Sequence, residues 1–333
     1  MRHFVIVGIL IIAVTVFLIV GLDAAHLMPV EASVQAEEID WMWKLQEIAM
    51  SFLFSLIVVP MAYSLVVFKR RKGDTEDAEH VEGNTRLEIA WSVIPLIAVL
   101  VFSVLGAGNL ANTIRPSANA MVVRVTAFQW AWKFDYPEYG FSSTEMYIPV
   151  NKAINLKMES SDVIHSFWVP EFRVKQDLVP GRVTELRFTP ILTGNYKVRC
   201  AELCGTSHYK MEQPVVVVSD AEFAAWAVEQ KELADQQSAT PEGHGQLLVQ
   251  NNVCSACHSI NGAAGIGPTW RGLFGEDVEL EDGTFVIADE AYLTESIKDP
   301  KAKIVKGFPS TMPVFPFTDE EIEHIVAYIK TLK

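Results

Sequence analysis

The sequence predicts a multidomain membrane protein in which N-terminal transmembrane α-helices are followed by an all-β sandwich and then by an all-α domain. Long uncharged apolar runs lie only in the first 110 residues, short alternating segments follow them, and helical periodicity returns near the C-terminus. The mean hydropathy is +0.21, although the chain carries 27 basic and 41 acidic residues. The apolar residues are therefore concentrated in one part of the chain.

Three uncharged runs are each long enough to cross a hydrocarbon core of about 30 Å. They lie at about 4–22, 48–68 and 89–110. The basic run at 69–72 directly follows the second one, and the positive-inside rule places it in the cytoplasm. Three crossings then put everything after Leu110 outside the cytoplasm. We expect residues 1–116 to form a membrane anchor.

The first run resembles a secretory signal, because Met1-Arg2-His3 precedes it. Its 19 residues are more than the roughly 7–15 residues of a signal's apolar region. We expect it to be retained as a helix.

Residues 117–236 carry short segments of alternating side chains, separated by Pro and Gly. The predicted strands include 122–126, 154–158, 184–188 and 215–218. Such closely spaced short strands favour an antiparallel sandwich. A helical stretch from Asp220 to about Gln236 follows the last strand.

A linker at 237–243 separates this sandwich from a domain at 244–333 that is helical at both ends. Thr318 and Glu321 match a capping box, which predicts the start of the last helix. The apolar residues of that helix recur on one face, at Ile322, Ile325, Ile329 and Leu332.

The net charge of −14 argues against binding to nucleic acid. Phosphate backbones are bound by clustered Lys and Arg, and no such cluster follows the membrane anchor.

Cys254, Cys257 and His258 form a C-x-x-C-H sequence, the pattern of covalent c-type haem attachment. In that pattern the two thiols hold the vinyl groups and the imidazole ligates iron. A redox dithiol or half of a zinc site are the alternatives. The domain has only His244 and His324 as further imidazoles, which we interpret as surface residues, and it lacks the βαβ context of a thioredoxin-like dithiol.

Met312 is the sixth-ligand candidate, because it alone of the ten methionines follows the haem motif. Its thioether would give His/Met ligation, which raises the reduction potential and suits electron transfer.

The other two cysteines lie in a sequence rich in soft ligands. Cys200, Cys204, His208 and Met211 are close together, and His165 lies upstream. Two thiolates, two imidazoles and a thioether favour copper. Two cysteines with two histidines can hold two copper ions, with both thiolates bridging and one imidazole terminal on each metal.

A disulfide and a structural zinc site are the two alternatives for this pair. The compartment is oxidising, and two Cys with two His would satisfy tetrahedral zinc. A disulfide makes poor use of the following His and Met, and zinc leaves Met211 and Glu202 without a purpose.

With these ligands the chain resembles subunit II of a haem-copper cytochrome c oxidase that carries a fused cytochrome c domain. The resemblance covers nearly the whole sequence. It includes the segment 84–95 leading into the last membrane helix and Gln129-Trp130-Ala131-Trp132, while 243–333, with Gly267-Pro268, resembles a class I cytochrome c. The family usually has two helices in this subunit, so the first run is a departure from it.

The resemblance implies a cupredoxin-like sandwich and a role for each matching residue. His165, Cys200, Cys204, His208 and Met211 would bind a dinuclear copper centre, with Glu202 adding its backbone carbonyl. The Glu202 side chain would approach a magnesium or manganese ion at the interface with subunit I. Trp130 would lie near the surface where electrons arrive, or be a core tryptophan. Glu88 would mark a proton-uptake path, or be an exposed carboxylate stabilised by the helix dipole.

The resemblance also implies partners and a location. Electrons from an external donor would pass through haem c and copper to subunit I, where oxygen is reduced and protons are translocated. Further membrane subunits are expected, in the bacterial inner membrane, with the copper and haem domains on the periplasmic side. The donor would be a basic cytochrome c or a respiratory complex, since residues 243–333 carry 13 acidic against 7 basic residues.

Two other classes share some of these features. A copper-containing nitric oxide reductase would use the same copper head with another catalytic subunit. A copper carrier or chaperone with a haem sensor predicts exchangeable copper in an exposed site.

Overall fold

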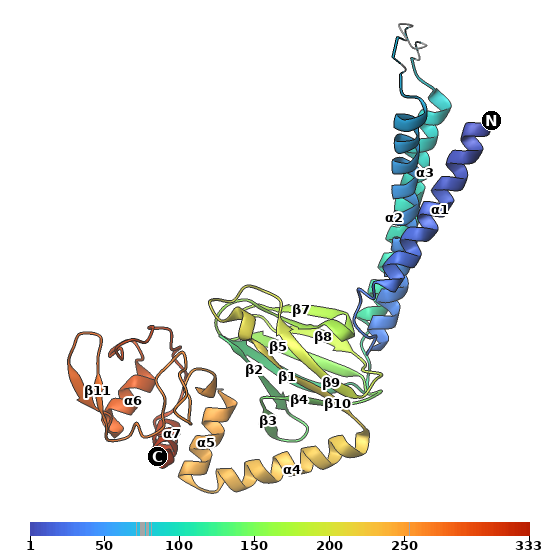
Figure 1. Cartoon of the computed structure of the whole chain (residues 1–333). Coiled ribbons are helices and arrows are strands. Elements are labelled where there is room, and N and C mark those ends of the chain that lie inside the picture. Colours follow the sequence, from blue (N-terminus) through green and yellow to red (C-terminus); the bar gives the residue numbers. More distant parts are fainter. Residues whose placement is uncertain (71, 74–76, 78–79, 81, 253) are drawn as a thin grey trace. The chain divides into compact units, whose positions relative to one another are not determined.

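A computed structural model describes the chain except residues 71, 74–76, 78–79, 81 and 253. Arg71 of the basic run therefore lies outside the described residues. The chain forms two compact units. Figure 1 colours the chain along its sequence and labels its helices and strands. The first contains Met1–Pro116 with Pro170–Arg173, and the second contains Ser117–Val169 with Val174–Lys333.

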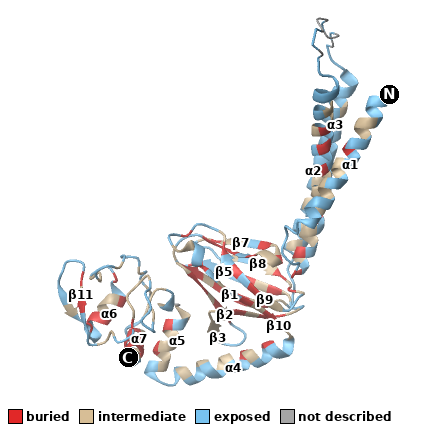
Figure 2. Cartoon of the chain, in the orientation of Figure 1, coloured by how far each residue is buried: buried red, intermediate tan, exposed pale blue. Residues whose placement is uncertain are grey.

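The first unit is built on three helices that are long and apolar enough to span a membrane, counted among the described residues. They are α1 (Arg2–Ala24), α2 (Val34–Val67) and α3 (Thr85–Thr113). Most of their side chains are exposed (Figure 2), as expected of helices that face lipid or other subunits.

Side-chain caps fix where two of these helices begin. The Ser33 hydroxyl accepts a hydrogen bond from Ala36 N, and the Asn84 side chain accepts one from Leu87 N. Because Ser33 caps α2, this helix begins 14 residues before the apolar run at 48–68, with a polar first part.

Arg173 ties the short segment Pro170–Arg173 to the anchor. Its guanidinium donates to both carboxylate oxygens of Asp40, at 2.9 and 2.8 Å, and to the carbonyl of Pro29 at 2.5 Å. Ser33 Oγ donates to the Phe172 carbonyl at 2.9 Å. These contacts join the start of α2 to a turn that lies more than 130 residues away in sequence.

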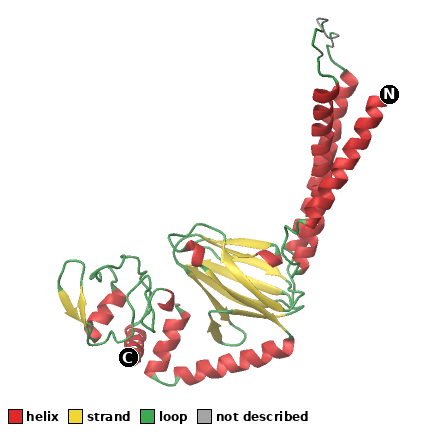
Figure 3. Ribbon diagram, in the orientation of Figure 1, coloured by secondary structure: helices red, strands yellow, loops and turns green. Residues whose placement is uncertain are grey.

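The second unit begins with a β-sandwich, and its described residues form two five-stranded sheets (Figure 3). One sheet has the order β3-β2-β1-β5-β8 and the other β4-β10-β9-β6-β7. The strands are β1 (Met121–Phe128), β2 (Ala131–Tyr136), β3 (Phe141–Ser143), β4 (Met146–Pro149), β5 (Ile154–Ser160), β6 (His165–Val169), β7 (Val174–Leu178), β8 (Thr184–Phe188), β9 (Gly194–Cys200) and β10 (Glu212–Val218).

The predicted β-sandwich is confirmed, but its strand directions are mixed, so the expectation that it is antiparallel holds only in part. Strand β1 runs parallel to β5, and β10 runs parallel to β4. Alternation of side chains shows which residues face the core but not which neighbour a strand takes or in which direction. The alternation itself is observed: in β5 every second residue from Ile154 to Ser160 is buried.

Helix α4 (Asp220–Ser238) covers one end of the sandwich with aromatic contacts. A capping box of Ser219 and Glu222 starts it. Trp226 stacks on Tyr147 with ring centroids 4.4 Å apart, and Tyr136 lies edge-on to Trp226 at 5.3 Å.

The C-terminal helical domain packs around α7 (Asp319–Thr331). The predicted capping box of Thr318 and Glu321 is confirmed, and Ile322, Ile325 and Ile329 are buried. The other elements are α5 (Pro241–Asn251), α6 (Glu290–Lys298) and the hairpin β11 (Asp277–Glu279) with β12 (Phe285–Ile287). Helices α4 and α5 follow each other after residues 239–240, so the segment between them is shorter than the expected linker at 237–243.

We predict that Tyr136→Phe destabilises the sandwich. The buried Tyr136 hydroxyl donates to the Tyr147 carbonyl at 3.0 Å and accepts from Tyr147 N at 2.8 Å. Removing it leaves two backbone groups without partners, which costs about 1–3 kcal/mol. Thermal unfolding of the detergent-solubilised chain, followed by tryptophan fluorescence, measures the loss. Tyr139→Phe is the control, since Tyr139 is 36% exposed. Equal melting temperatures for the two variants would contradict the prediction.

Candidate metal centre and haem-binding site

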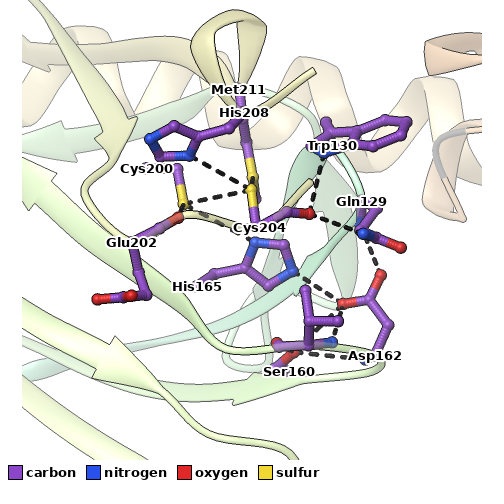
Figure 4. A network of polar contacts seen from close by, with 11 residues as sticks. Gln129, Trp130, Ser160, Asp162, His165, Cys200, Glu202, Cys204, His208 and Met211 are labelled. Atoms are coloured by element: carbon purple, nitrogen blue, oxygen red, sulfur yellow. Dashed lines mark hydrogen bonds and ion pairs between the residues drawn. The ribbon is translucent and has the colours of Figure 1, made fainter. Parts of the chain in front are cut away.

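Strand pairing brings the predicted copper ligands together. His165 begins β6 and Cys200 ends β9, and these strands are neighbours with Phe167 opposite Cys200. The loop after Cys200 returns to the same sheet, so that Cys200 N donates to the Met211 carbonyl at 3.1 Å. Residues 35 positions apart therefore meet at one end of the sheet (Figure 4).

Side chains from these elements surround the two sulfur atoms of Cys200 and Cys204. The Sγ atoms are 3.7 Å apart, which excludes a disulfide, whose S–S length is about 2.05 Å. His165 Nδ1 lies 3.8 Å from Cys200 Sγ, and His208 Nδ1 lies 3.4 Å from Cys204 Sγ. Met211 Sδ is 3.7 Å from Cys204 Sγ. Each thiol thus has its own imidazole, and the thioether contacts the second thiol.

Glu202 faces the two cysteine sulfur atoms with its backbone carbonyl and not with its side chain. Its carbonyl oxygen lies 3.1 Å from Cys200 Sγ, while Figure 4 shows its carboxylate directed away from the sulfur atoms. The carboxylate is therefore free to serve another group.

The two thiols differ in acidity. Burial alone would raise the pKa of Cys200, but contacts with His165, Ser166 N and the Glu202 backbone lower it to about 6. Burial and the neighbouring Cys200 charge raise the pKa of Cys204 to about 12. Cys200 is therefore the more acidic of the two thiols, and metal binding by Cys204 requires the loss of its proton.

Asp162 is a site residue that the sequence reasoning missed. Its Oδ1 lies 2.8 Å from His165 Nε2, and its Oδ2 accepts a hydrogen bond from Gln129 N at 2.7 Å. Burial opposes ionisation, but these bonds hold the pKa of Asp162 below its usual range. Burial alone would lower the pKa of His165, but its contacts with Asp162 and Cys200 raise it. A carboxylate behind a metal-binding imidazole fixes its orientation, and an Asp three residues before a candidate His was the available signal.

Trp130 and Gln129 both bind the backbone of the cysteine loop. Trp130 Nε1 donates to the Cys204 carbonyl at 3.1 Å, and Gln129 Nε2 donates to the same oxygen at 2.7 Å. Trp130 is half-buried, so it is neither a core residue nor a freely exposed one.

The predicted haem residues line one cavity in the C-terminal domain. Its walls include Cys254, Cys257, His258, Pro268, Ile297 and Met312. A thioether, an imidazole and two thiols around an apolar cavity fit a covalently attached haem.

The orientation of His258 is fixed by its neighbours. Its Nδ1 donates to the Pro268 carbonyl at 2.8 Å, which leaves Nε2 available as a ligand. Trp270 stacks on the ring at 4.8 Å with an interplanar angle of 14°. Burial lowers the pKa of His258, against the opposing effect of its bond to the Pro268 carbonyl, and so favours the neutral imidazole. A Cβ at Gly267 would lie 2.8 Å from the His258 ring, so a side chain there would displace it.

Models of known families match three parts of the chain. The transmembrane domain of cytochrome c oxidase subunit II matches residues 20–106, its periplasmic domain 141–221, and cytochrome c 243–333. A cytochrome c oxidase subunit 2 from Alkalihalophilus pseudofirmus is 32% identical over 291 residues, which are 84% of this chain and 83% of the relative. The chain belongs to the cytochrome c oxidase subunit II family.

Two further relatives, each named cytochrome c oxidase subunit 2, are similar to this chain. One, from Bacillus subtilis, is 30% identical over an aligned region that spans 81% of this chain and 82% of the relative. The other, from Synechocystis, is 33% identical over an aligned region that spans 60% of this chain and 74% of the relative. Membership in this family means that the protein is a membrane component of an oxidoreductase. The chain binds copper and haem c and passes electrons into the oxidase.

Glu88, the predicted proton-path residue of this subunit II, is exposed in the first turn of α3. Its Oε1 accepts a hydrogen bond from Asn84 N at 3.3 Å. The contact accounts for a helix-capping role and leaves the second carboxylate oxygen available.

We predict that Asp162→Asn weakens copper binding about 10- to 100-fold, as other losses of outer-shell carboxylates do. An amide cannot accept from both His165 and Gln129, and it removes the negative charge that favours oxidised copper. The reduction potential of the copper centre should therefore rise. Copper competition titration and potentiometry measure the two effects.

Asp135→Asn is the matched control for that variant, because Asp135 binds Ser142 and Lys133 elsewhere on the sandwich. If both variants keep the affinity and the potential of the unmodified chain, Asp162 has no influence on the metal.

Proposed function

We propose that this subunit II accepts electrons from an external donor at a covalent haem c and passes them through a dinuclear copper centre to the oxygen-reducing subunit I. The oxidase would reside in a bacterial inner membrane, with the copper and haem domains on the periplasmic side, and its oxygen reduction would be coupled to proton translocation. The two metal groups would supply reversible one-electron chemistry.

The observation that carries this proposal is the arrangement around Cys200 and Cys204. Two sulfur atoms 3.7 Å apart, each with its own imidazole at 3.8 or 3.4 Å, form a paired donor set. Cys200, Cys204, His165 and His208 would together hold two copper ions, with one imidazole available for each ion. Zinc would take four of these donors and leave the Met211 thioether and the Glu202 carbonyl unused.

Burial supports permanent occupancy, which argues against a copper carrier. His165 is fully buried, and Cys204 and Met211 are 2% and 1% exposed. A carrier must release its metal to a partner, whereas these side chains exclude water and hold the donors in fixed positions. A fixed donor set also suits electron transfer, since the ligands need not move when the charge of the metal changes.

Other residues of the chain extend the proposal to its partners. The Glu202 carboxylate, directed away from the sulfur atoms, would hold magnesium or manganese at the interface with subunit I. Trp130 would carry electrons toward the copper centre through its bond to the Cys204 carbonyl. Glu88 would mark the start of a proton path. The acidic surface of 243–333 would attract a basic cytochrome c or a basic face of a respiratory complex.

We predict that Cys200→Ser abolishes the dinuclear copper signal and leaves haem c intact. The variant removes one of the two sulfur donors, so electron transfer into the oxidase should fall by at least about tenfold, the effect that weaker perturbations of metal sites produce. Electron paramagnetic resonance and oxygen uptake of the assembled complex measure these effects. Leu203→Ala is the control, because Leu203 lies in the same loop and is 79% exposed. A copper signal that is unchanged in the Cys200 variant would contradict the assignment of Cys200 as a copper ligand.

We predict that Met312→Ala leaves haem attached through Cys254 and Cys257 but lowers its reduction potential, because His/Met ligation raises it. The thioether-to-iron charge-transfer band should disappear, and turnover with external donors should slow. Optical spectroscopy and potentiometry are the measurements. Val314→Ala, in the same segment and 66% exposed, should change neither. Persistence of the band would show that another group is the sixth ligand.

A further inference from the structure

A second pair of imidazoles meets within the C-terminal domain, at His244 of α5 and His324 of α7. Their Nδ1 atoms are 2.7 Å apart, and their ring centroids lie 4.8 Å apart at an interplanar angle of 63°. Neither side chain is among those that line the haem cavity. The sequence predicts that both lie on helices at the surface, and both are on helices and half-buried. Their contact was not predicted, because 80 residues separate them in the chain.

The backbones of the two helices hold this pair in place. A Cβ at Gly245 would lie 1.8 Å from the His324 carbonyl oxygen, so α5 and α7 cross in direct backbone contact beside the imidazoles. Thr240 caps α5 and Thr318 caps α7, while Ile325, next to His324, is 2% exposed. Because both histidines project from packed helices, their backbone positions are set before any ligand arrives, and only the rings need to turn.

The contact requires that one Nδ1 carries a proton and donates it to the lone pair of the other. If the donating ring moves that proton to its Nε2, both Nδ1 lone pairs become available. Two nitrogen atoms that each lie about 2.0–2.1 Å from a tetrahedral metal ion are about 3.3 Å apart. The pair therefore needs to open by only about 0.6 Å, within reach of a small rotation of each side chain.

We propose that His244 and His324 form a binding site for a divalent transition-metal ion of the zinc class. Neutral imidazole nitrogen is a preferred ligand of such ions. Both side chains are half-buried, so water can complete the coordination. The bound ion would link α5 to α7 and stabilise the domain that holds haem, separately from the copper centre and independently of the proposed electron transfer.

Zinc binding to the full-length chain, with copper and haem already loaded, tests this site. Zn²⁺ is titrated in competition with a chromophoric chelator, and X-ray absorption at the zinc edge reports imidazole ligands. The expected result is one zinc ion per chain with imidazole scattering, and a higher melting temperature of the haem domain in zinc. Absence of a zinc-imidazole signal in the unmodified chain overturns the proposal.

Two substitutions of the same size separate ligation from structure. His324→Gln should weaken zinc binding about tenfold or more, by comparison with losses at other metal sites, whereas His324→Glu should retain most of it through a carboxylate oxygen. His26→Gln, at an exposed imidazole of the membrane anchor, should change nothing. Equal zinc affinity of the Gln and Glu variants, whether both high or both low, counts against the site. The haem spectrum of each variant shows that the domain is folded.

Discussion

The proposed copper site depends on the register of three neighbouring strands, β6, β9 and β10. Pairing of Phe167 with Cys200 fixes where β6 begins relative to the end of β9. The bond from Cys200 N to the Met211 carbonyl then fixes the return of the cysteine loop. A shift of one residue in either pairing would turn a sulfur or imidazole to the opposite face of the sheet. The buried apolar residues that alternate along β9, such as Val198, hold that register.

The two cysteines that these strands position have different electrostatic surroundings. The carboxylate of Asp162 acts through His165 on Cys200, whereas Cys204 lies between an imidazole and a thioether. The pKa of the Cys200 thiol is lowered and that of the Cys204 thiol is raised, so the two halves of the donor set differ in acidity. This difference arises from the hydrogen bonds that Cys200 receives and from the burial of Cys204 beside it.

Much of this arrangement could be predicted from the sequence, because local spacing encodes it. The C-x-x-C-H sequence, the spacing from Cys200 to Met211 and the capping box at Thr318 are all read within a few residues. Contacts between distant segments could not be predicted in that way. The bond of Gln129 to Asp162, the meeting of His244 with His324 and the parallel pairing of β1 with β5 depend on how strands and helices pack. Trp130 shows an intermediate case, since its motif was recognised but its bond to the Cys204 carbonyl was not.

Arg173 limits where the chain can be divided. Its side chain is 6% exposed, and its charge is compensated by Asp40, which precedes the β-sandwich by about eighty residues. A soluble fragment that starts at Ser117 would keep the guanidinium and lose both the carboxylate and the Pro29 carbonyl. Spectroscopic studies of an excised copper domain would therefore examine a molecule with an unpaired cation at the β6–β7 turn. Replacing Arg173 by a neutral polar residue, or retaining residues 29–40 as a separate peptide, would restore a compensated surface.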